Sequence, residues 1–335
     1  MLLRKFPRPR LPRVVGAVLL IGTMCGAPGC AVASDAGFSV PPTRPDEIFL
    51  PQPVASILEA QIALARERIS PGPIDGVHGL QTAAAVRAYQ EREDMRPSGQ
   101  LDDATRARLV LTSPAFTRIV LAAEDLADLQ PLSPTWLGKS TQTALAYETV
   151  LELVAERAHA SPRLIRQLNP EVDWEHLATG TVLTVPATQP IAPPRKAAEL
   201  HIRLAERVLQ ARAPDGRLLA HFPVSIAQMV EKRPVGELRV TVAIPDPNYT
   251  FDPEVFPESE EGRQLGRRLL LPPGPNNPVG VAWIGLDRPG YGIHGTPLPE
   301  SVGRTESHGC FRLANWDART LLELVAVGMP VVVDP

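Results

Sequence analysis

The sequence predicts a multidomain α+β protein in which helical modules precede a mainly-β domain. Apolar residues recur with α-helical spacing between residues 54 and 187. Alternating, strand-like patterns dominate residues 197–335 until a helical pattern appears near the end. Proline-rich segments separate these regions, and 335 residues are enough for two or three domains.

The composition is that of a folded protein with many loops. Hydrophobic residues make up 44% and charged residues 21%, which excludes wholesale disorder and a multi-span membrane protein. Proline and glycine together account for 61 of 335 residues, so loops and linkers are frequent. The formal net charge of -3 provides no polycationic surface. We therefore expect no nucleic-acid partner.

Residues 1–33 have the composition of an export signal. Five basic residues precede an uncharged run over residues 14–24, and Ala31-Val32-Ala33 supplies the small-x-small pattern of a signal peptidase site. Cleavage after Ala33 would take the net charge from -3 to -8, because this segment carries five basic and no acidic residues. Two alternatives are lipidation of Cys30 in an imperfect lipobox and an uncleaved membrane anchor over residues 14–33. Each exports the chain, to the periplasm or the cell envelope.

We divide the chain into seven segments by these patterns. They are a signal peptide (1–33), a Pro-rich linker (34–53), a three-helix module (54–111), a helical connector (112–134), a second small module (135–187), a linker (188–196) and the mainly-β domain (197–335).

The first module has the pattern of three short helices. Thr82, Ala85, Val86 and Tyr89 form one buried stripe of the second helix, and Asp102 or Asp103 is the candidate cap of the third. The module resembles the peptidoglycan-binding domain, whose pattern P-G-x-x-D-G-x-x-G-x-x-T-x-x-A-V-x-x-F-Q is matched from Pro71 to Gln90, with Tyr for Phe. The resemblance implies wall binding, although most matched positions are turn and core positions.

The second module, residues 135–187, shows two helical patterns and a short strand. The second helical pattern ends at Asn169-Pro170, and Gly-Thr-x-Leu-x-Val-Pro follows. This order resembles a diverged LysM module, which would be an α/β glycan-binding unit. The usual opening Gly-Asp-Thr is missing after Tyr147. A structural spacer is therefore the alternative interpretation.

The last domain has the pattern of a sheet with one late helix. Asp215-Gly216 between apolar runs is typical of a hairpin turn. The expected strands cover residues 200–204, 222–226, 238–244, 281–286 and 330–333, and the helix covers 317–327.

Cys310 is the residue on which the predicted chemistry depends. Cys25 and Cys30 lie in the leader, so Cys310 is the sole unmodified thiol of the exported chain unless an uncleaved anchor is retained. A thiol with a pKa of about 8.5 is mostly protonated at pH 7, so a nucleophilic cysteine needs an imidazole that takes its proton. From the residues alone, either His294 or His308 could serve.

Two glycines flank this chemistry. Gly295 and Gly309 leave room for a substrate backbone beside the sulfur. Backbone amides around Gly309 and Cys310 could also receive an oxyanion.

Two stretches around these residues resemble the active-site signature of the L,D-transpeptidases. His294-Gly295-Thr296 matches H-G-T, and the six residues from Ser307 to Arg312 match S-H-G-C-[IVF]-R, with Asn315 and Asp317 downstream. The resemblance extends over residues 197–335. The sequence departs from the family pattern at two places. Phe311 stands where Ile is commoner, and Arg233-Pro234 stands where Thr-Pro is frequent. Neither departure changes a residue that the reaction would use.

The resemblance implies an enzyme of peptidoglycan biogenesis and cell shape that uses no cofactor. Cys310 would attack the carbonyl at the third residue of a tetrapeptide stem and expel the terminal D-Ala. An amine of a neighbouring stem would then resolve the thioester into a 3→3 cross-link.

The resemblance also assigns roles to the remaining signature residues. His294 is the base, oriented by a backbone carbonyl near Gly295, and His308 lies beside the nucleophile. Arg312 orders the loop or meets a substrate carboxylate. Ser307 and Thr296 are expected among the substrate-binding residues.

Three other interpretations compete with this one. His294, His308 and Cys310 could bind zinc, but a structural site needs a fourth ligand and no second cysteine is present, so we expect no metal. Water as the acceptor would make the protein an L,D-carboxypeptidase, and another amine would make it an enzyme that attaches proteins to the wall. A non-catalytic wall-binding protein would leave the signature unexplained.

Overall fold

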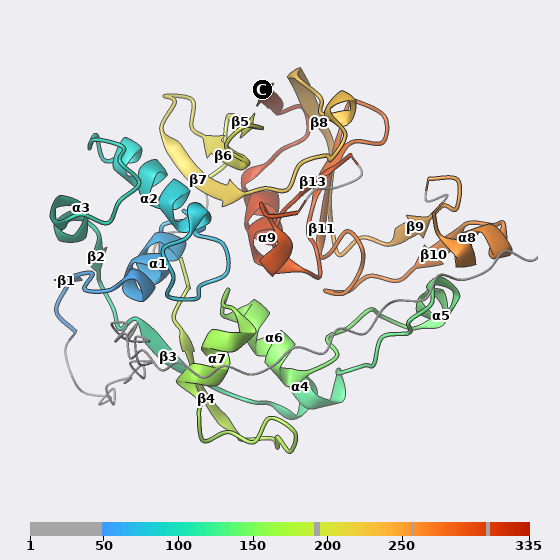
Figure 1. Ribbon diagram of the computed structural model, residues 1–335, viewed down its shortest axis with the longest axis horizontal. Coiled ribbons are helices and arrows are strands. Elements are labelled where there is room, and N and C mark those ends of the chain that lie inside the picture. The colour runs from blue at the N-terminus through green and yellow to red at the C-terminus, as the bar shows by residue number, and fades with distance from the viewer. Residues whose placement is uncertain (1–48, 191–194, 256–257, 306–308) are drawn as a thin grey trace, which may run out of the picture. The chain divides into compact units, whose positions relative to one another are not determined.

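The structure, a computed structural model, describes residues 49–190, 195–255, 258–305 and 309–335 (Figure 1). These residues belong to one unit of mutual contacts, Phe38–Pro335. The expected signal peptide, the alternatives at Cys30 and residues 14–33, and most of the first linker lie outside the described residues, as do Ser307 and His308. No helix of the described part is long and apolar enough to cross a membrane.

The first module contains the three expected helices. They are α1 (Ile57–Arg66), α2 (Leu80–Arg92) and α3 (Asp103–Arg108), and short strands β1 (Gln52–Pro53) and β2 (Val110–Leu111) pair antiparallel beside them. Asp102 is the cap of α3, because its carboxylate accepts the backbone N–H of Thr105 at 2.8 Å.

A buried glutamine, Gln61, fixes the turn between α1 and α2. Its Oε1 accepts the N–H of Gly76 at 2.8 Å, and its Nε2 donates to Asp75 Oδ1 at 2.9 Å and to Thr82 Oγ1 at 3.0 Å. Gly76 has φ +77, a conformation that favours glycine. Asp75, Gly76 and Thr82, three positions of the pattern that runs from Pro71 to Gln90, thus stabilise this turn.

The expected helical connector, residues 112–134, begins instead with a strand. β3 (Phe116–Val120) pairs antiparallel with β4 (Val182–Pro186), and α4 (Ala123–Ala127) follows. The expectation was wrong here because β3 has no local partner. Its β-branched and aromatic residues suit a strand, but the strand that pairs with it lies far along the chain.

The second module contains α6 (Val150–Arg157) and α7 (Pro162–Leu168) as expected, preceded by α5 (Trp136–Thr141). Asn169 ends α7 and ties it to β4, because its side-chain amide donates to Thr184 O at 2.8 Å and accepts from Thr184 N at 2.7 Å. Buried side chains from Val54 to Val185 form one hydrophobic cluster. The two N-terminal modules therefore share a core.

The last domain is built on one curved sheet. Among the described residues, eight strands pair in the order β13-β12-β11-β8-β14-β5-β6-β7. Their bounds, in that order, are Phe311–Arg312, Gly292–His294, Ala282–Leu286, Gly236–Pro245, Pro330–Asp334, Glu199–Arg203, Val208–Arg212 and Leu218–Pro223.

The late helix, α9 (Asn315–Leu324), packs against β11, β8 and β12 (Figure 1). It begins two residues earlier and ends three residues earlier than expected, and the strand expected at 222–226 lies at Leu218–Pro223. Short 3-10 helices occur at Val230–Lys232 and Pro299–Ser301.

A small flap beside this sheet contacts the second module. β9 (Tyr249–Phe251) and β10 (Leu269–Leu271) form a two-stranded sheet, with α8 (Glu260–Leu265) between them in the chain. The rings of Trp136 and Phe251 stack with centroids 4.4 Å apart. The carboxylate of Glu261 also accepts the first two N–H groups of α5, at 2.8 Å each. The N-terminus of α5 is thus capped by the flap.

The first module contacts the other edge of the large sheet, at β7. Ser70 N donates to His221 O at 2.8 Å, and His221 N donates to Arg68 O at 2.9 Å. Gln81 Nε2, on α2, also donates to the backbone oxygen of Val302. The chain between α1 and α2 thus extends the sheet by a strand-like segment.

Candidate active site

Parallel pairing of β12 and β13 brings the segments that carry His294 and Cys310 next to each other. Ile293 lies opposite Phe311, and His294 lies opposite Arg312. Ile293 and Phe311 are buried in the core. Because side chains alternate along a strand, His294 and Arg312 point to the opposite face. Cys310 directly precedes β13, and its Sγ lies beside the loop that leads into β12.

The thiol of Cys310 is partly buried beside the loop that precedes β12. Its Sγ lies 3.5 Å from the carbonyl oxygen of Gly290. Burial raises the pKa of the Cys310 thiol, and a hydrogen bond from the backbone of Gly292 opposes this shift. The thiol is therefore protonated at neutral pH.

His294 is buried, with 7% of its surface exposed. Its Nδ1 lies 2.6 Å from the carbonyl oxygen of Gly295, which can only accept, so Nδ1 carries the proton and donates. The lone pair is then on Nε2. Burial lowers the pKa of His294 to about 4, and the charge of Arg312 lowers it further, whereas the bond to Gly295 opposes the shift. A neutral imidazole with a defined tautomer can act as a general base.

Trp283 lies next to His294 on β11 and forms one wall of the site. The two residues are directly opposite in the antiparallel pair, and their rings stack with centroids 5.8 Å apart. A Cβ at Gly292 would lie 2.6 Å from two atoms of the Trp283 ring, so only glycine fits there. No sequence motif points to Trp283, because its contact with His294 is set by the register of β11 and β12.

Tyr249, on β9 of the flap, is a second residue that the sequence did not reveal. Burial raises the pKa of its phenol to about 12, and the charge of Asp252, together with that of Cys310 whenever its thiol is ionised, raises it further. The phenol therefore lies within electrostatic range of the thiol. No motif surrounds Tyr249, and only the folding of the flap brings it there.

Gly295 does not fit the expectation of open space or of an oxyanion contact. Its N–H donates to Ala282 O at 3.2 Å within the sheet, so it is already used. A Cβ at this position would lie 2.3 Å from Asn315 Oδ1, which shows that the Asn315 side chain fills the space. The carbonyl of Gly295, by contrast, makes the contact to His294 that the resemblance implies.

The other predicted site residues that the structure describes have different local environments. They are Thr296, Arg312 and Gly309. Thr296 is buried and its Oγ1 accepts Leu298 N at 3.3 Å, a contact within the turn. Arg312 donates from Nη2 to Thr305 Oγ1 at 3.2 Å, and its predicted role in ordering the loop or binding a carboxylate stays a prediction. A Cβ at Gly309 would meet no heavy atom of the described chain within 4 Å, which leaves room there. Ser307 and His308 lie outside the described residues, so their roles stay predictions.

No group of three or more His, Cys, Asp or Glu side chains in the described part of the chain is arranged to hold a metal ion.

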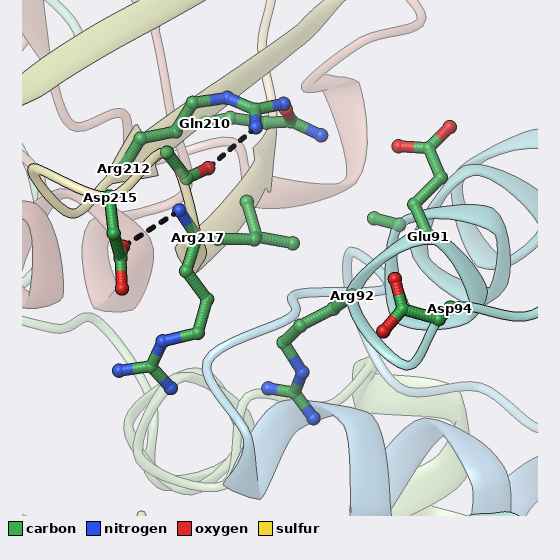
Figure 2. Close-up of a pocket in the computed structure, with 10 residues that line it drawn as sticks. Glu91, Arg92, Asp94, Gln210, Arg212, Asp215 and Arg217 are labelled. Atoms are coloured by element: carbon green, nitrogen blue, oxygen red, sulfur yellow. Dashed lines mark hydrogen bonds between the residues drawn. The ribbon is translucent and has the colours of Figure 1, made fainter.

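A polar cleft of about 370 Å³ lies between the end of α2 and the β6–β7 hairpin (Figure 2). Charges of both signs line it, and Arg212 donates to Gln210 Oε1 at 2.7 Å while Asp215 accepts the N–H of Arg217 at 3.0 Å. None of the described residues that line it is a cysteine or histidine. The thiol chemistry therefore belongs to the β12–β13 site.

Comparison with known proteins identifies two domains in the chain. Residues 197–333 match the family model described as "L,D-transpeptidase catalytic domain", and residues 54–109 match "Putative peptidoglycan binding domain". The chain is 31% identical over 224 residues to "Probable L,D-transpeptidase ErfK/SrfK" of Escherichia coli K12, covering 65% of this chain and 71% of that one. It is 26% identical over 186 residues to "Putative L,D-transpeptidase YkuD" of Bacillus licheniformis, covering 55% and 93%.

Solved structures of L,D-transpeptidases are also similar. One from Mycobacterium smegmatis has a TM-score of 0.33 at 16% identity and covers 49% of this chain and 80% of that one. L,D-transpeptidase 3 of Mycobacterium tuberculosis, in complex with a faropenem-derived adduct, has a TM-score of 0.33 at 17% identity and covers 48% and 76%.

The chain belongs to the L,D-transpeptidase family, and a peptidoglycan-binding domain precedes its catalytic domain. The LysM-like interpretation of residues 135–187 stays a prediction.

Proposed function

We propose that this protein is an exported enzyme that forms 3→3 cross-links in peptidoglycan through a thioester on Cys310. The observation that carries the proposal is the pairing of β12, which holds His294, with β13, which directly follows Cys310, together with the lone pair of His294 on Nε2. The membership in the family and the preceding peptidoglycan-binding domain support it.

The first half-reaction transfers the acyl group to the enzyme. The thiol proton of Cys310 moves to His294 Nε2 as Sγ attacks the carbonyl carbon between the third residue of a tetrapeptide stem and its terminal D-Ala. The C–N bond then breaks, and His294 returns the proton to the leaving amine. The products are a thioester and free D-Ala.

The second half-reaction restores the thiol. The amine of a neighbouring stem attacks the thioester carbonyl, the C–S bond breaks, and the proton lost by the amine returns to sulfur through His294. Because both resting groups are neutral, proton transfer accompanies attack in each half-reaction, and no thiolate needs to be stored.

Export and wall retention are part of the proposal. The leader of residues 1–33 supports passage to the periplasm or cell envelope, with cleavage after Ala33 favoured over lipidation at Cys30 or a retained anchor. The peptidoglycan-binding domain supports retention at the wall.

The test is incubation of the mature protein with purified tetrapeptide muropeptides, followed by mass spectrometry of the products. Cross-linked dimers that have lost one D-Ala support the proposal. Tripeptides alone would indicate water as the acceptor, which is the carboxypeptidase alternative. Unchanged tetrapeptides would refute the enzymatic function in both forms.

Three variants assign the chemistry. Cys310→Ala should abolish the products while leaving wall binding intact. His294→Ala should abolish acylation by a carbapenem, whereas His308→Ala should only slow it, because the base is assigned to His294. The reverse pattern would move the base to His308.

A further inference from the structure

We propose that Glu156, on α6 of the second module, is a positioning residue that orients the base His294 through Asn315 and Gly295. The proposal rests on the proposed function, since it concerns the base of that reaction. It gives the second module a role in the active site that its LysM-like pattern does not suggest.

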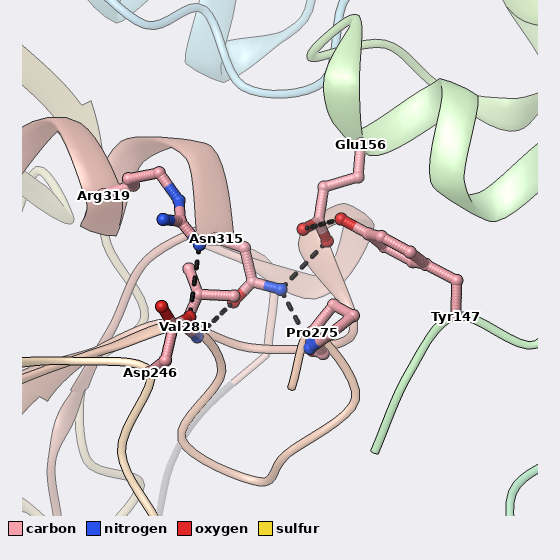
Figure 3. Close-up of polar contacts among 7 residues, drawn as sticks. All are labelled: Tyr147, Glu156, Asp246, Pro275, Val281, Asn315 and Arg319. Carbon is pink, nitrogen blue, oxygen red and sulfur yellow. Dashed lines mark hydrogen bonds and ion pairs between the residues drawn. The ribbon is translucent and has the colours of Figure 1, made fainter. Parts of the chain in front are cut away.

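The first link joins Glu156 to Asn315 across the boundary between the second module and the catalytic domain (Figure 3). Asn315 Nδ2 donates to Glu156 Oε2 at 2.9 Å, and Tyr147 OH donates to Glu156 Oε1 at 2.8 Å. Both carboxylate oxygens are therefore engaged by donors from two directions, which fixes the plane of the carboxylate. Figure 3 shows Glu156 pointing from its helix toward Asn315.

The second link joins Asn315 to the strand end that carries His294. Asn315 Oδ1 accepts Val281 N at 3.3 Å, and Nδ2 also donates to Pro275 O at 3.0 Å. A Cβ at Gly280 or at Gly295 would lie 2.0 or 2.3 Å from Asn315 Oδ1. The side-chain amide of Asn315 thus packs directly against the backbones of Gly280 and Gly295. The position of Gly295 is fixed by this contact and by the hydrogen bond that its own N–H donates to Ala282 O.

The third link is the contact from Gly295 to the imidazole. The carbonyl of Gly295 accepts the proton of His294 Nδ1 at 2.6 Å, so its direction sets both the tautomer and the ring orientation of His294. On the other side, His294 O accepts Leu313 N at 2.8 Å, which fixes the backbone of β12 but not the ring. Ring orientation therefore depends on Gly295 and on the stacked ring of Trp283.

Burial makes the first link strong. Glu156 is partly buried, and its desolvation raises the pKa of its carboxyl to about 7, while the donors Asn315 and Tyr147 oppose that shift. A buried acceptor that loses its donor is costly, so the pair has few alternative arrangements. A further contact, Asn276 Nδ2 to Glu152 Oε1 at 2.7 Å, holds the same helix against the catalytic domain.

The experiment compares acylation of three full-length variants by a carbapenem under saturating conditions. Glu156→Ala removes the acceptor. Glu156→Gln keeps an oxygen for Asn315, and its NH₂ can donate to a reoriented Tyr147 hydroxyl. Arg157→Ala is the matched control, because the neighbouring Arg157 pairs instead with Asp125 of α4, in the connector, at 2.7 Å.

The expected result is a change in rate and not in affinity. Glu156→Ala should lower the limiting acylation rate about ten-fold, with the half-saturating concentration changed by less than about two-fold, because a misplaced base slows chemistry without altering ligand contacts. Glu156→Gln should stay within about three-fold of the wild-type rate, and Arg157→Ala should match the wild type.

A proton NMR readout separates positioning from general destabilisation. The short bond from Nδ1 to Gly295 should give a downfield His294 signal in the wild type, identified by its absence from His294→Ala. That signal should broaden or vanish in Glu156→Ala and persist in Glu156→Gln and Arg157→Ala. If Glu156→Ala does not fold, Tyr147→Phe, which removes one of the two donors to Glu156, should lower the acylation rate about three-fold.

Two results would overturn the inference. One is a wild-type acylation rate and an unchanged His294 signal in folded Glu156→Ala, or in Tyr147→Phe if the first variant does not fold. The other is equal loss in the Ala and Gln variants, which would exclude hydrogen-bond positioning. Failure of the wild type itself to be acylated would instead reject the proposed function.

Discussion

The hydroxyl of Ser70 donates a hydrogen bond of 2.9 Å to Oδ2 of Asp317, and both side chains are buried. Ser70 lies in the first module, whereas Asp317 lies on α9, which follows the stretch that contains Cys310. Burial raises the pKa of Asp317 to about 8, and the bond from Ser70 only partly opposes this shift. A protonated carboxyl thus lies at the contact between the first module and the catalytic domain at neutral pH.

This contact predicts a specific dependence of stability on pH. The unfolded chain releases the Asp317 proton near pH 4 and the folded chain retains it to about pH 8, so this group lowers stability as pH rises between these values. The Asp317→Asn variant has no carboxyl proton to release, and its amide oxygen can still accept the hydrogen bond from Ser70. Its melting temperature relative to wild type should therefore rise from pH 4 to pH 8. The exposed Asp128→Asn is the control, and parallel curves for Asp317→Asn and wild type would contradict the prediction.

The same contact bears on deletion of the first module. Removing residues 54–111 would expose the β7 edge, where Ser70 and Arg68 bond to His221, and would split the core shared by the two N-terminal modules. We therefore expect the truncated protein to melt at a lower temperature and to be acylated more slowly, not merely to lose wall binding. Circular dichroism melting and carbapenem acylation would check this. Unchanged values in both would mean that the catalytic domain is independent.

Local patterns in the sequence predicted much of the fold. The helical stripe at Thr82 to Tyr89 and the alternation at residues 200–204 depend only on neighbours in the chain, and they correspond to α2 and β5. The signature around His294 and Cys310 was visible because both residues lie in short glycine-containing motifs. Their parallel pairing, however, follows from the register of β12 and β13.

The missed features depend on strand register or on contacts between distant segments. β3 pairs with β4 across the three helices of the second module, and Trp283 lies opposite His294 only through the register of β11 and β12. In the sequence, nothing distinguishes Glu156 from the other acidic residues of an amphipathic helix. Its contact with Asn315 exists because two modules pack together, and no periodicity encodes such a contact.

The resting state of the thiol gives a further prediction. Burial raises the pKa of Cys310 and lowers that of His294 to about 4, so both shifts favour the neutral pair over a thiolate and an imidazolium. Thiolate absorbance at 240 nm, taken as the difference between wild type and Cys310→Ser, should not rise between pH 5 and pH 8. A step centred below pH 7 would show a preformed ion pair and would replace concerted proton transfer with attack by a stored thiolate.

Two glycines on either side of the proposed chemistry should respond differently to alanine. A Cβ at position 295 would lie 2.3 Å from Asn315 Oδ1, so Gly295→Ala must displace the amide or the strand end that orients His294. We expect a loss of about 1–3 kcal/mol in the free energy of unfolding, typical of overpacking. Carbapenem acylation should fall with it. The Cβ that Gly309→Ala adds would lie within 4 Å of no heavy atom of the described residues. This variant should therefore keep the wild-type melting temperature, even where it changes substrate binding. Thermal melts of the two variants check the difference, and equal stability would show that Asn315 does not confine Gly295.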